Sequence, residues 1–335
     1  MAAPAPISKP TRADWFGWGM VALGGGSAPS AINLAIETAP PTVVATVRLW
    51  SAAALLLVYI LATGRPMASP LSKEGRSVWL YAIAAGFMGY AMPFLLFPYA
   101  QLQVSSIMAG IVMAFLPVMA VIMAAAFAGE PMTRRSLTGV LVGSTGVLFL
   151  IGPALLGGAS GTVAGIVMLL MAVFGYASLG VIMRRAPEFP ARSFAAMMML
   201  AAAIMSTPAI FISDLEGISA ASWAAIAYLG IVPTGINAIL IVATVRRAGA
   251  AFLSTSAYAS PVLAVFFGIL FFSEPLHLYQ VLGLLTILTG IALTQNAFAR
   301  LQKTIVPRIV TTAFPNRKTR SPESRQEASP PRADA

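Results

Sequence analysis

The residue with the clearest chemical potential in this sequence is an arginine, Arg48, inside the apolar segment 42–62. If that segment crosses a membrane, an ionisable side chain within it is costly and marks a functional site by default. The guanidinium group could bind a substrate carboxylate, pair with helix-end carbonyls or with Glu37, or extend to the membrane interface near the Pro40–Pro41 turn. The sequence leaves these three alternatives open.

Further polar side chains recur on single faces of apolar segments. Ser27, Ser30 and Asn33 follow one another at intervals of three residues, and Tyr258 stands four residues after Ser254. Serines in such segments often only join helices, with hydrogen bonds worth ~0.6 kcal/mol, whereas Asn and Tyr are harder to bury without a partner. The residues predicted to line a substrate cavity are Ser27, Ser30, Asn33, Arg48, Tyr90, Tyr99, Tyr176, Asn237, Ser254 and Tyr258.

Two prolines and two glutamates are expected to shape the helices. Pro93 and Pro233 each remove a backbone hydrogen bond, so we expect kinks there and hinges for a conformational change. Glu130 and Glu274 each precede a proline suited to a first helical turn. Because a carboxylate is favourable at a helix N-terminus, we expect both to be structural caps rather than a proton-coupling pair.

The composition argues against catalysis, metals and cofactors. The sequence has no cysteine and one histidine, His277, so it offers no thiolate chemistry, zinc–sulfur site or histidine pair. It also lacks a Gly-x-x-x-x-Gly-Lys-Ser/Thr phosphate loop. We therefore expect no catalytic residues, no metal and no cofactor. A membrane enzyme remains a remote alternative, because its acids are scattered.

The hydropathy of the chain requires a membrane. Of its 335 residues, 58% are hydrophobic and 10% are charged, against about 45–50% and about 25% in soluble domains. The net charge of +10 lies in short clusters between apolar runs, which indicates topology signals rather than nucleic-acid binding. The expected spans, each close to the ~20 residues that cross a bilayer, are 15–36, 42–62, 78–98, 104–128, 136–155, 161–183, 193–212, 221–244, 250–272 and 278–297.

The basic residues orient these spans. Of the 21 Lys and Arg residues, 20 lie in the N-terminal segment, in alternate loops and in the C-terminal tail. The positive-inside rule then places both termini in the cytoplasm of a bacterial-type inner membrane. The segment 1–14 is expected to be cytoplasmic, and the basic tail 298–335 to be cytoplasmic and disordered.

An internal duplication underlies the chain. When it is shifted by 144 residues, Pro117–Gly146 matches Pro261–Gly290 at 11 of 30 positions, and Tyr90 and Pro93 fall on Thr234 and Asn237. Each repeat holds five spans, so the second repeat must enter the membrane from the opposite side. Inverted repeats are typical of secondary transporters, which bind substrate near the midplane where the repeats meet.

The ordered motifs resemble those of a known family. They are Arg48 in TVVATVRLWSAAALL after the Pro40–Pro41 turn, the segment GYAMPFLLFPYAQLQVSS, the GEP and SEP sequences, and the Gly-rich fifth and tenth spans. Together they resemble the EamA family of the drug/metabolite transporter superfamily over about residues 15–297. The resemblance implies ten helices in two inverted repeats and a central cavity.

The sequence thus predicts an all-α integral membrane protein with ten transmembrane helices in two inverted five-helix repeats, 15–155 and 161–297. Its expected function is secondary transport, most simply export of amino acids or related small metabolites by alternating access. Import of a small metabolite or vitamin is the alternative. The expected partners are a small-molecule substrate and the lipid bilayer, not nucleic acid, and the oligomeric state is left open between monomer and homodimer.

Overall fold

The computed structural model describes residues 10–157 and 160–295, and all regular secondary structure in these ranges is helical. The predicted segment 1–14 lies mostly outside the described residues, and the predicted tail 298–335 lies wholly outside them. The elements are α1 Arg12–Ile36, α2 Pro41–Ala62, α3 Lys73–Gly86, η1 Phe87–Ala91, α4 Met92–Gln101, α5 Ser106–Met113, α6 Leu116–Phe127, α7 Arg134–Leu156, α8 Ser160–Arg185, α9 Ala191–Ser206, η2 Thr207–Ile210, α10 Ala220–Leu229, η3 Gly230–Ile236, α11 Asn237–Ala248, α12 Ala250–Leu253, α13 Ser256–Phe272 and α14 Leu278–Thr294.

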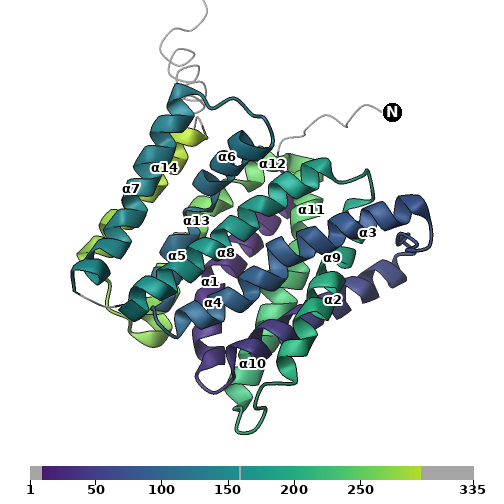
Figure 1. Cartoon of the computed structure of the whole chain (residues 1–335), viewed down its shortest axis with the longest axis horizontal. Helices are drawn as coiled ribbons and strands as arrows, with labels where there is room; N and C mark the ends of the chain where they lie inside the picture. The colour runs from purple at the N-terminus through teal and green to yellow at the C-terminus, as the bar shows by residue number, and fades with distance from the viewer. Residues whose placement is uncertain (1–9, 158–159, 296–335) are drawn as a thin grey trace, which may run out of the picture. The chain divides into compact units, whose positions relative to one another are not determined.

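These elements form long apolar rods that often consist of several joined pieces. In the described ranges, eight continuous helical segments are long and apolar enough to cross a membrane, and α13 and α14 are two shorter apolar helices. Figure 1 shows α7 and α14 side by side at one edge of the bundle, and α2, α3 and α9 near the other. The last two expected spans therefore correspond to the shorter helices, with α12 separated from α13 by a turn.

Two helical rods contain π-helical segments at corresponding positions. η1 joins α3 to α4, and η3 joins α10 to α11. Shifted by 144 residues, Phe87–Ala91 falls on 231–235, inside η3. Pro233 lies within η3 and Pro93 is the second residue of α4, so both prolines stand where the α-helical hydrogen bonding is interrupted. Such π segments occur frequently at functional sites.

Glycines hold the homologous helices α7 and α14 together. A Cβ on Gly139 would lie 2.8 Å from the carbonyl oxygen of Gly290, and a Cβ on Gly146 would lie 2.8 Å from that of Gly283. Under the 144-residue shift, Gly139 corresponds to Gly283 and Gly146 to Gly290. Each contact is therefore the counterpart of the other, and the order of the contacts makes the two helices antiparallel.

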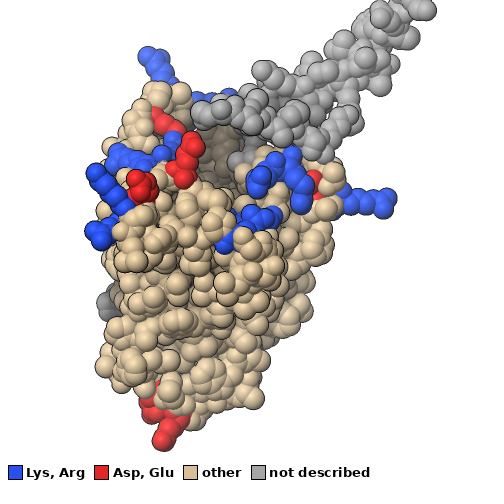
Figure 2. Space-filling view, turned by 90° about the vertical axis from the view of Figure 1, so that its right-hand side faces the viewer, with Lys and Arg blue, Asp and Glu red and all other residues tan. Residues whose placement is uncertain are grey.

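The bundle has two chemically different ends. Hydrogen bonds join Thr38 to Ser222 at 2.8 Å and Thr42 to Ser213 at 2.5 Å, so the loops 37–40 and 211–219 lie together. We name this the acidic end, because these loops carry Glu37, Asp214 and Glu216. The opposite, basic end holds the contact of Glu130 with Arg184. On the face shown in Figure 2, Lys and Arg side chains gather at one end, and the opposite end carries only acidic charge.

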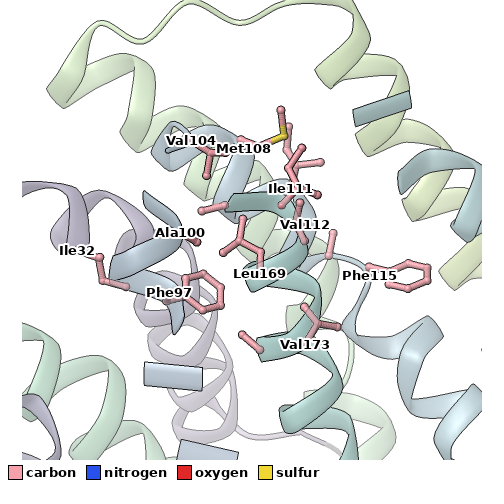
Figure 3. Close-up of a cluster of buried hydrophobic side chains, with 14 of the residues drawn as sticks. Ile32, Phe97, Ala100, Val104, Met108, Ile111, Val112, Phe115, Leu169 and Val173 are labelled. Atoms are coloured by element: carbon pink, nitrogen blue, oxygen red, sulfur yellow. The ribbon is translucent and has the colours of Figure 1, made fainter. Parts of the chain in front are cut away.

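The main core lies where α1, α4, α5 and α8 meet. Its side chains include Ile32, Phe97, Ile111 and Leu169, all at most 5% exposed, and they interdigitate in Figure 3. The cluster continues through Val104 to Ile107 near the start of α5. Buried apolar side chains therefore reach the acidic end of the bundle at the start of α5.

Candidate functional site

A cavity of ≈ 260 Å³ lies between the helices of the two sequence repeats. It is lined by residues of α1, α2, α4, α5 and α6 with η1 from the first repeat, and of α8, α11 and η3 from the second. Both π-helical segments thus border the same cavity. Its volume is slightly below the usual lower range of ≈ 300 Å³ for ligand pockets, which suits a molecule of amino-acid size.

Arg48 places a buried cation on the wall of this cavity. The residue is 7% exposed, and its Cζ lies 3.8 Å from the centroid of the Phe94 ring. Its Nε donates a hydrogen bond of 3.0 Å to Oγ1 of Thr234. Within residues 10–157 and 160–295 no carboxylate pairs with the guanidinium group, and Glu37 does not contact it. Arg48 therefore neither extends to the interface nor pairs with Glu37.

The partner of Arg48 is itself fixed by the interrupted helix. Pro233 has no N–H to donate to the carbonyl of Leu229, four residues earlier. The hydroxyl of Thr234 donates to that carbonyl at 2.7 Å and accepts from Arg48. The π segment thus positions Thr234, and Thr234 positions the guanidinium group, which leaves the two Nη groups without a hydrogen bond in the described part of the chain.

Three more polar side chains line the same cavity and form no side-chain hydrogen bond among the described residues. They are Tyr90, Tyr176 and Asn237. Oδ1 of Asn237 is buried and accepts no hydrogen bond there, and Asn237 is 4% exposed. Because buried polar groups are normally hydrogen-bonded, these convergent donors and acceptors are suited to a ligand or to water.

The two sides of the cavity differ. Toward the acidic end it is bounded by Ile32 and Phe97, which belong to the buried core. Toward the basic end its lining includes Ile241, one turn beyond Asn237 and 39% exposed. The cavity is therefore sealed by packed side chains at the acidic side and reaches an exposed side chain at the basic side.

Comparison with known proteins identifies the family. The model of the "EamA-like transporter family" matches the chain twice, over residues 15–152 and 163–295. This chain belongs to the EamA-like transporter family. A solved structure described as "Crystal structure of protein" is 21% identical, with a TM-score of 0.59, and the match covers 85% of this chain and 97% of that one. No curated protein matches.

Four of the cavity residues predicted from sequence line this cavity, namely Arg48, Tyr90, Tyr176 and Asn237. The other six do not line it. Ser27 and Ser30 line a second cavity of ≈ 780 Å³ between α1, α10 and α13, where Ser27 and the hydroxyl of Tyr228 lie 2.6 Å apart. Both serines thus face away from Arg48, because Gly24, Ala28 and Ile32 present the other face of α1 to the central cavity.

The remaining predicted residues lie apart from both cavities. Tyr99 is 39% exposed, Ser254 is exposed in the turn between α12 and α13, and Asn33 is partly buried on α1. The hydroxyl of Tyr258 donates to Oε1 of Gln295 at 3.3 Å. These positions correct the sequence-based prediction, which could not tell which face of an apolar helix turns to the cavity.

The expected roles of the two glutamates also need correction. Neither caps the helix that follows it, because Thr133 caps α7 and His277 is the N-cap residue of α14. Glu130 instead pairs with Arg184. Glu274 does cap a helix, but it is α5 of the other repeat, through the N–H groups of Ser106 and Ile107 at 2.9 Å each.

Sequence reasoning missed Thr234, Phe94 and Phe97 as cavity residues. Thr234 could have been found, since it is the counterpart of Tyr90 in the repeat and follows Pro233. The two phenylalanines carry no such signal, because they stand among many apolar residues. No group of three or more His, Asp or Glu residues that could hold a metal occurs in the described ranges.

Proposed function

We propose that this EamA-like chain is a secondary transporter that exports amino acids or related small metabolites carrying a carboxylate. The observation that carries the proposal is Arg48, a buried cation on the cavity wall without a carboxylate partner in the described residues. Leaving a charge buried and unpaired is expensive. A substrate carboxylate would supply the missing partner and form a charge-assisted, bidentate pair with the Nη groups.

The other unpaired groups fit the rest of such a substrate. Oδ1 of Asn237 can accept from an ammonium group, and the hydroxyls of Tyr90 and Tyr176 can donate or accept. Phe94 and Phe97 give the cavity an apolar wall. The size and chemistry of the lining thus favour a small molecule with one acidic group, one donor and a modest apolar part.

Alternating access is the mechanism that best fits the duplication. The paired contacts of Gly139 with Gly290 and of Gly146 with Gly283 are those expected of two repeats related by a two-fold axis across the bundle. Such a pair of inverted repeats supplies two similar arrangements open to opposite sides, with the substrate site between them. Rocking about the interrupted helices at Pro93 and Pro233 would exchange the two.

The sidedness of the bundle supports export. The positive-inside rule assigns the basic end to the cytoplasm, and the cavity reaches an exposed side chain toward that end. A cytoplasmic metabolite could load there. An importer would use the same cavity in reverse, so the test must report direction.

The test is an untargeted measurement of extracellular metabolites. It compares cells that lack the protein with cells that overproduce it. Export predicts that one or more small carboxylate-bearing metabolites accumulate outside the overproducing cells and that Arg48→Gln abolishes the accumulation. Depletion of an external nutrient instead would favour import. No difference in any small metabolite would contradict transport.

A further inference from the structure

Glu274 joins the two repeats at the acidic end of the bundle. Its carboxylate accepts hydrogen bonds of 2.9 Å from the backbone N–H groups of Ser106 and of Ile107, which are the first two residues of α5. The first N–H groups of a helix have no partner within the helix, and they attract negative charge. One side chain thus satisfies two donors that lie 168 and 167 residues away in sequence.

The backbone around Glu274 has the same form as the backbone around its counterpart. Ser273 has a φ of 49°, and the N–H of Glu274 bonds to the carbonyl of Gly268 at 3.3 Å. In the first repeat Gly129 has a φ of 68°, and the N–H of Glu130 bonds to the carbonyl of Ala124 at 3.3 Å. Both turns are helix-ending motifs of one type. The residue with positive φ, the glutamate and the residue whose carbonyl accepts are each 144 residues apart between the two turns.

The side chains of these two glutamates nevertheless have different partners. Glu130 pairs with Arg184 at the basic end, where both side chains are about half exposed. Glu274 instead bridges to the opposite repeat, and a Cβ on Gly268 would lie only 2.5 Å from Cγ1 of Ile107. Because the local backbone is the same, the difference arises from how the repeats are arranged. They are in close contact at the acidic end around Glu274.

We propose that the Glu274 carboxylate is the latch of the gate at the acidic end, and that its two bonds to α5 must break before the cavity opens to that side. The cavity is closed there by Ile32 and Phe97, in the same cluster as Ile107. Release of Glu274 would allow α5 to move away from α13. This movement would separate Ile107 of α5 from the other side chains of the cluster. The latch acts on the cycle described under the proposed function, but its test needs no substrate.

The absence of cysteine from the natural sequence allows a direct test. A single cysteine at Ala28, on the cavity wall, should be offered to a membrane-impermeant maleimide from each side of sealed vesicles. In the otherwise natural protein we expect labelling from the side of the basic end. With Glu274→Gln, labelling from the side of the acidic end should rise at least about tenfold, which corresponds to about 1.4 kcal/mol.

A second variant removes a donor and leaves Glu274 intact. Ser106 is the first residue of α5, where proline is tolerated, and Ser105 before it is extended, with φ −67° and ψ 162°, as a residue preceding proline should be. Ser106→Pro deletes one of the two N–H groups, so it should raise labelling from the acidic side by less than Glu274→Gln. Glu130→Gln is the matched control and should leave this labelling unchanged.

The outcomes separate the latch from the transport function. Faster labelling from the acidic side in both variants supports the latch even if no metabolite is moved. Unchanged labelling in both variants, with a folded protein that elutes as a single species, overturns the latch even if transport is found. An equal rise with Glu130→Gln would also overturn it, because the effect would then not be specific to the Glu274 contact.

Discussion

Nε of Arg48 donates a hydrogen bond of 3.0 Å to the hydroxyl of Thr234, which in turn donates to the carbonyl of Leu229. Pro233, four residues after Leu229, has no N–H to make the α-helical hydrogen bond to that carbonyl. A helix defect in the second repeat therefore holds a cation that belongs to the first. The two Nη groups form no hydrogen bond with the protein in the described ranges. This arrangement makes Arg48 suited to an anionic ligand.

Replacing Arg48 should weaken substrate binding strongly. A hydrogen bond to a charged group contributes about 1.5–3 kcal/mol, so Arg48→Gln should raise the dissociation constant of a carboxylate-bearing substrate about 10- to 100-fold. Arg48→Lys should recover part of this affinity, since lysine keeps the positive charge but cannot form the two parallel hydrogen bonds of a guanidinium group with a carboxylate. Binding can be measured as ligand-induced thermal stabilisation of purified protein. Arg246→Gln, on the exposed face of α11, is the control and should bind as the natural protein does.

Removing the hydroxyl of Thr234 should have a smaller effect. Thr234→Val keeps the shape but loses both hydrogen bonds, at about 1 kcal/mol, so KM should rise roughly two- to tenfold. Thr234→Ser should restore the natural value. Thr289→Val removes a comparable hydroxyl, bonded at 2.8 Å to the carbonyl of Leu285 on exposed α14 surface, and should leave KM unchanged. Equal effects of the two valine variants would contradict the assigned role of Thr234.

The glycine contact of α7 with α14 should be sensitive to a single methyl group. A Cβ on Gly290 would lie 2.6 Å from the backbone nitrogen of Gly143, and overpacking of this kind costs about 1–3 kcal/mol. Gly290→Ala should therefore lower the melting temperature in detergent by several degrees. Gly152→Ala, in α7 with nothing within 4 Å of its Cβ, should leave the melting temperature unchanged or raise it. The reverse order of the two variants would show that the packing is not as described.

The orientation of the bundle can be tested with two single cysteines. Glu216→Cys lies at the acidic end and Lys73→Cys at the basic end, and both positions are exposed. If the basic end faces the cytoplasm, an impermeant maleimide should label Glu216→Cys in intact cells and Lys73→Cys only after permeabilisation. The opposite pattern would reverse the proposed orientation and the argument for export.

Much of this architecture could be predicted from the sequence, because the apolar runs and the 144-residue repeat can both be recognised in it. Arg48 was singled out because a charge is conspicuous in an apolar span. Tyr90, Tyr176 and Asn237 are large polar residues in apolar surroundings, and the structure places them in the same cavity. The role of these residues in binding stays a prediction.

Other features were out of reach because they depend on how helices are rotated and packed. Ser27 and Ser30 share a face of α1, but both faces of that helix are apolar enough to meet other helices. Glu274 is followed by proline, which predicts a cap on the next helix. Its actual partner, α5, is distant in sequence, and no local pattern indicates that contact.

The most direct test of the central claim is counterflow in proteoliposomes containing the purified chain. Vesicles preloaded with one unlabelled amino acid or small carboxylic acid at a time should transiently accumulate the same labelled compound from outside. We expect accumulation for at least one such compound with the natural protein and none with Arg48→Gln. Failure of the natural protein to exchange any carboxylate-bearing metabolite, or equal exchange by Arg48→Gln, would contradict it.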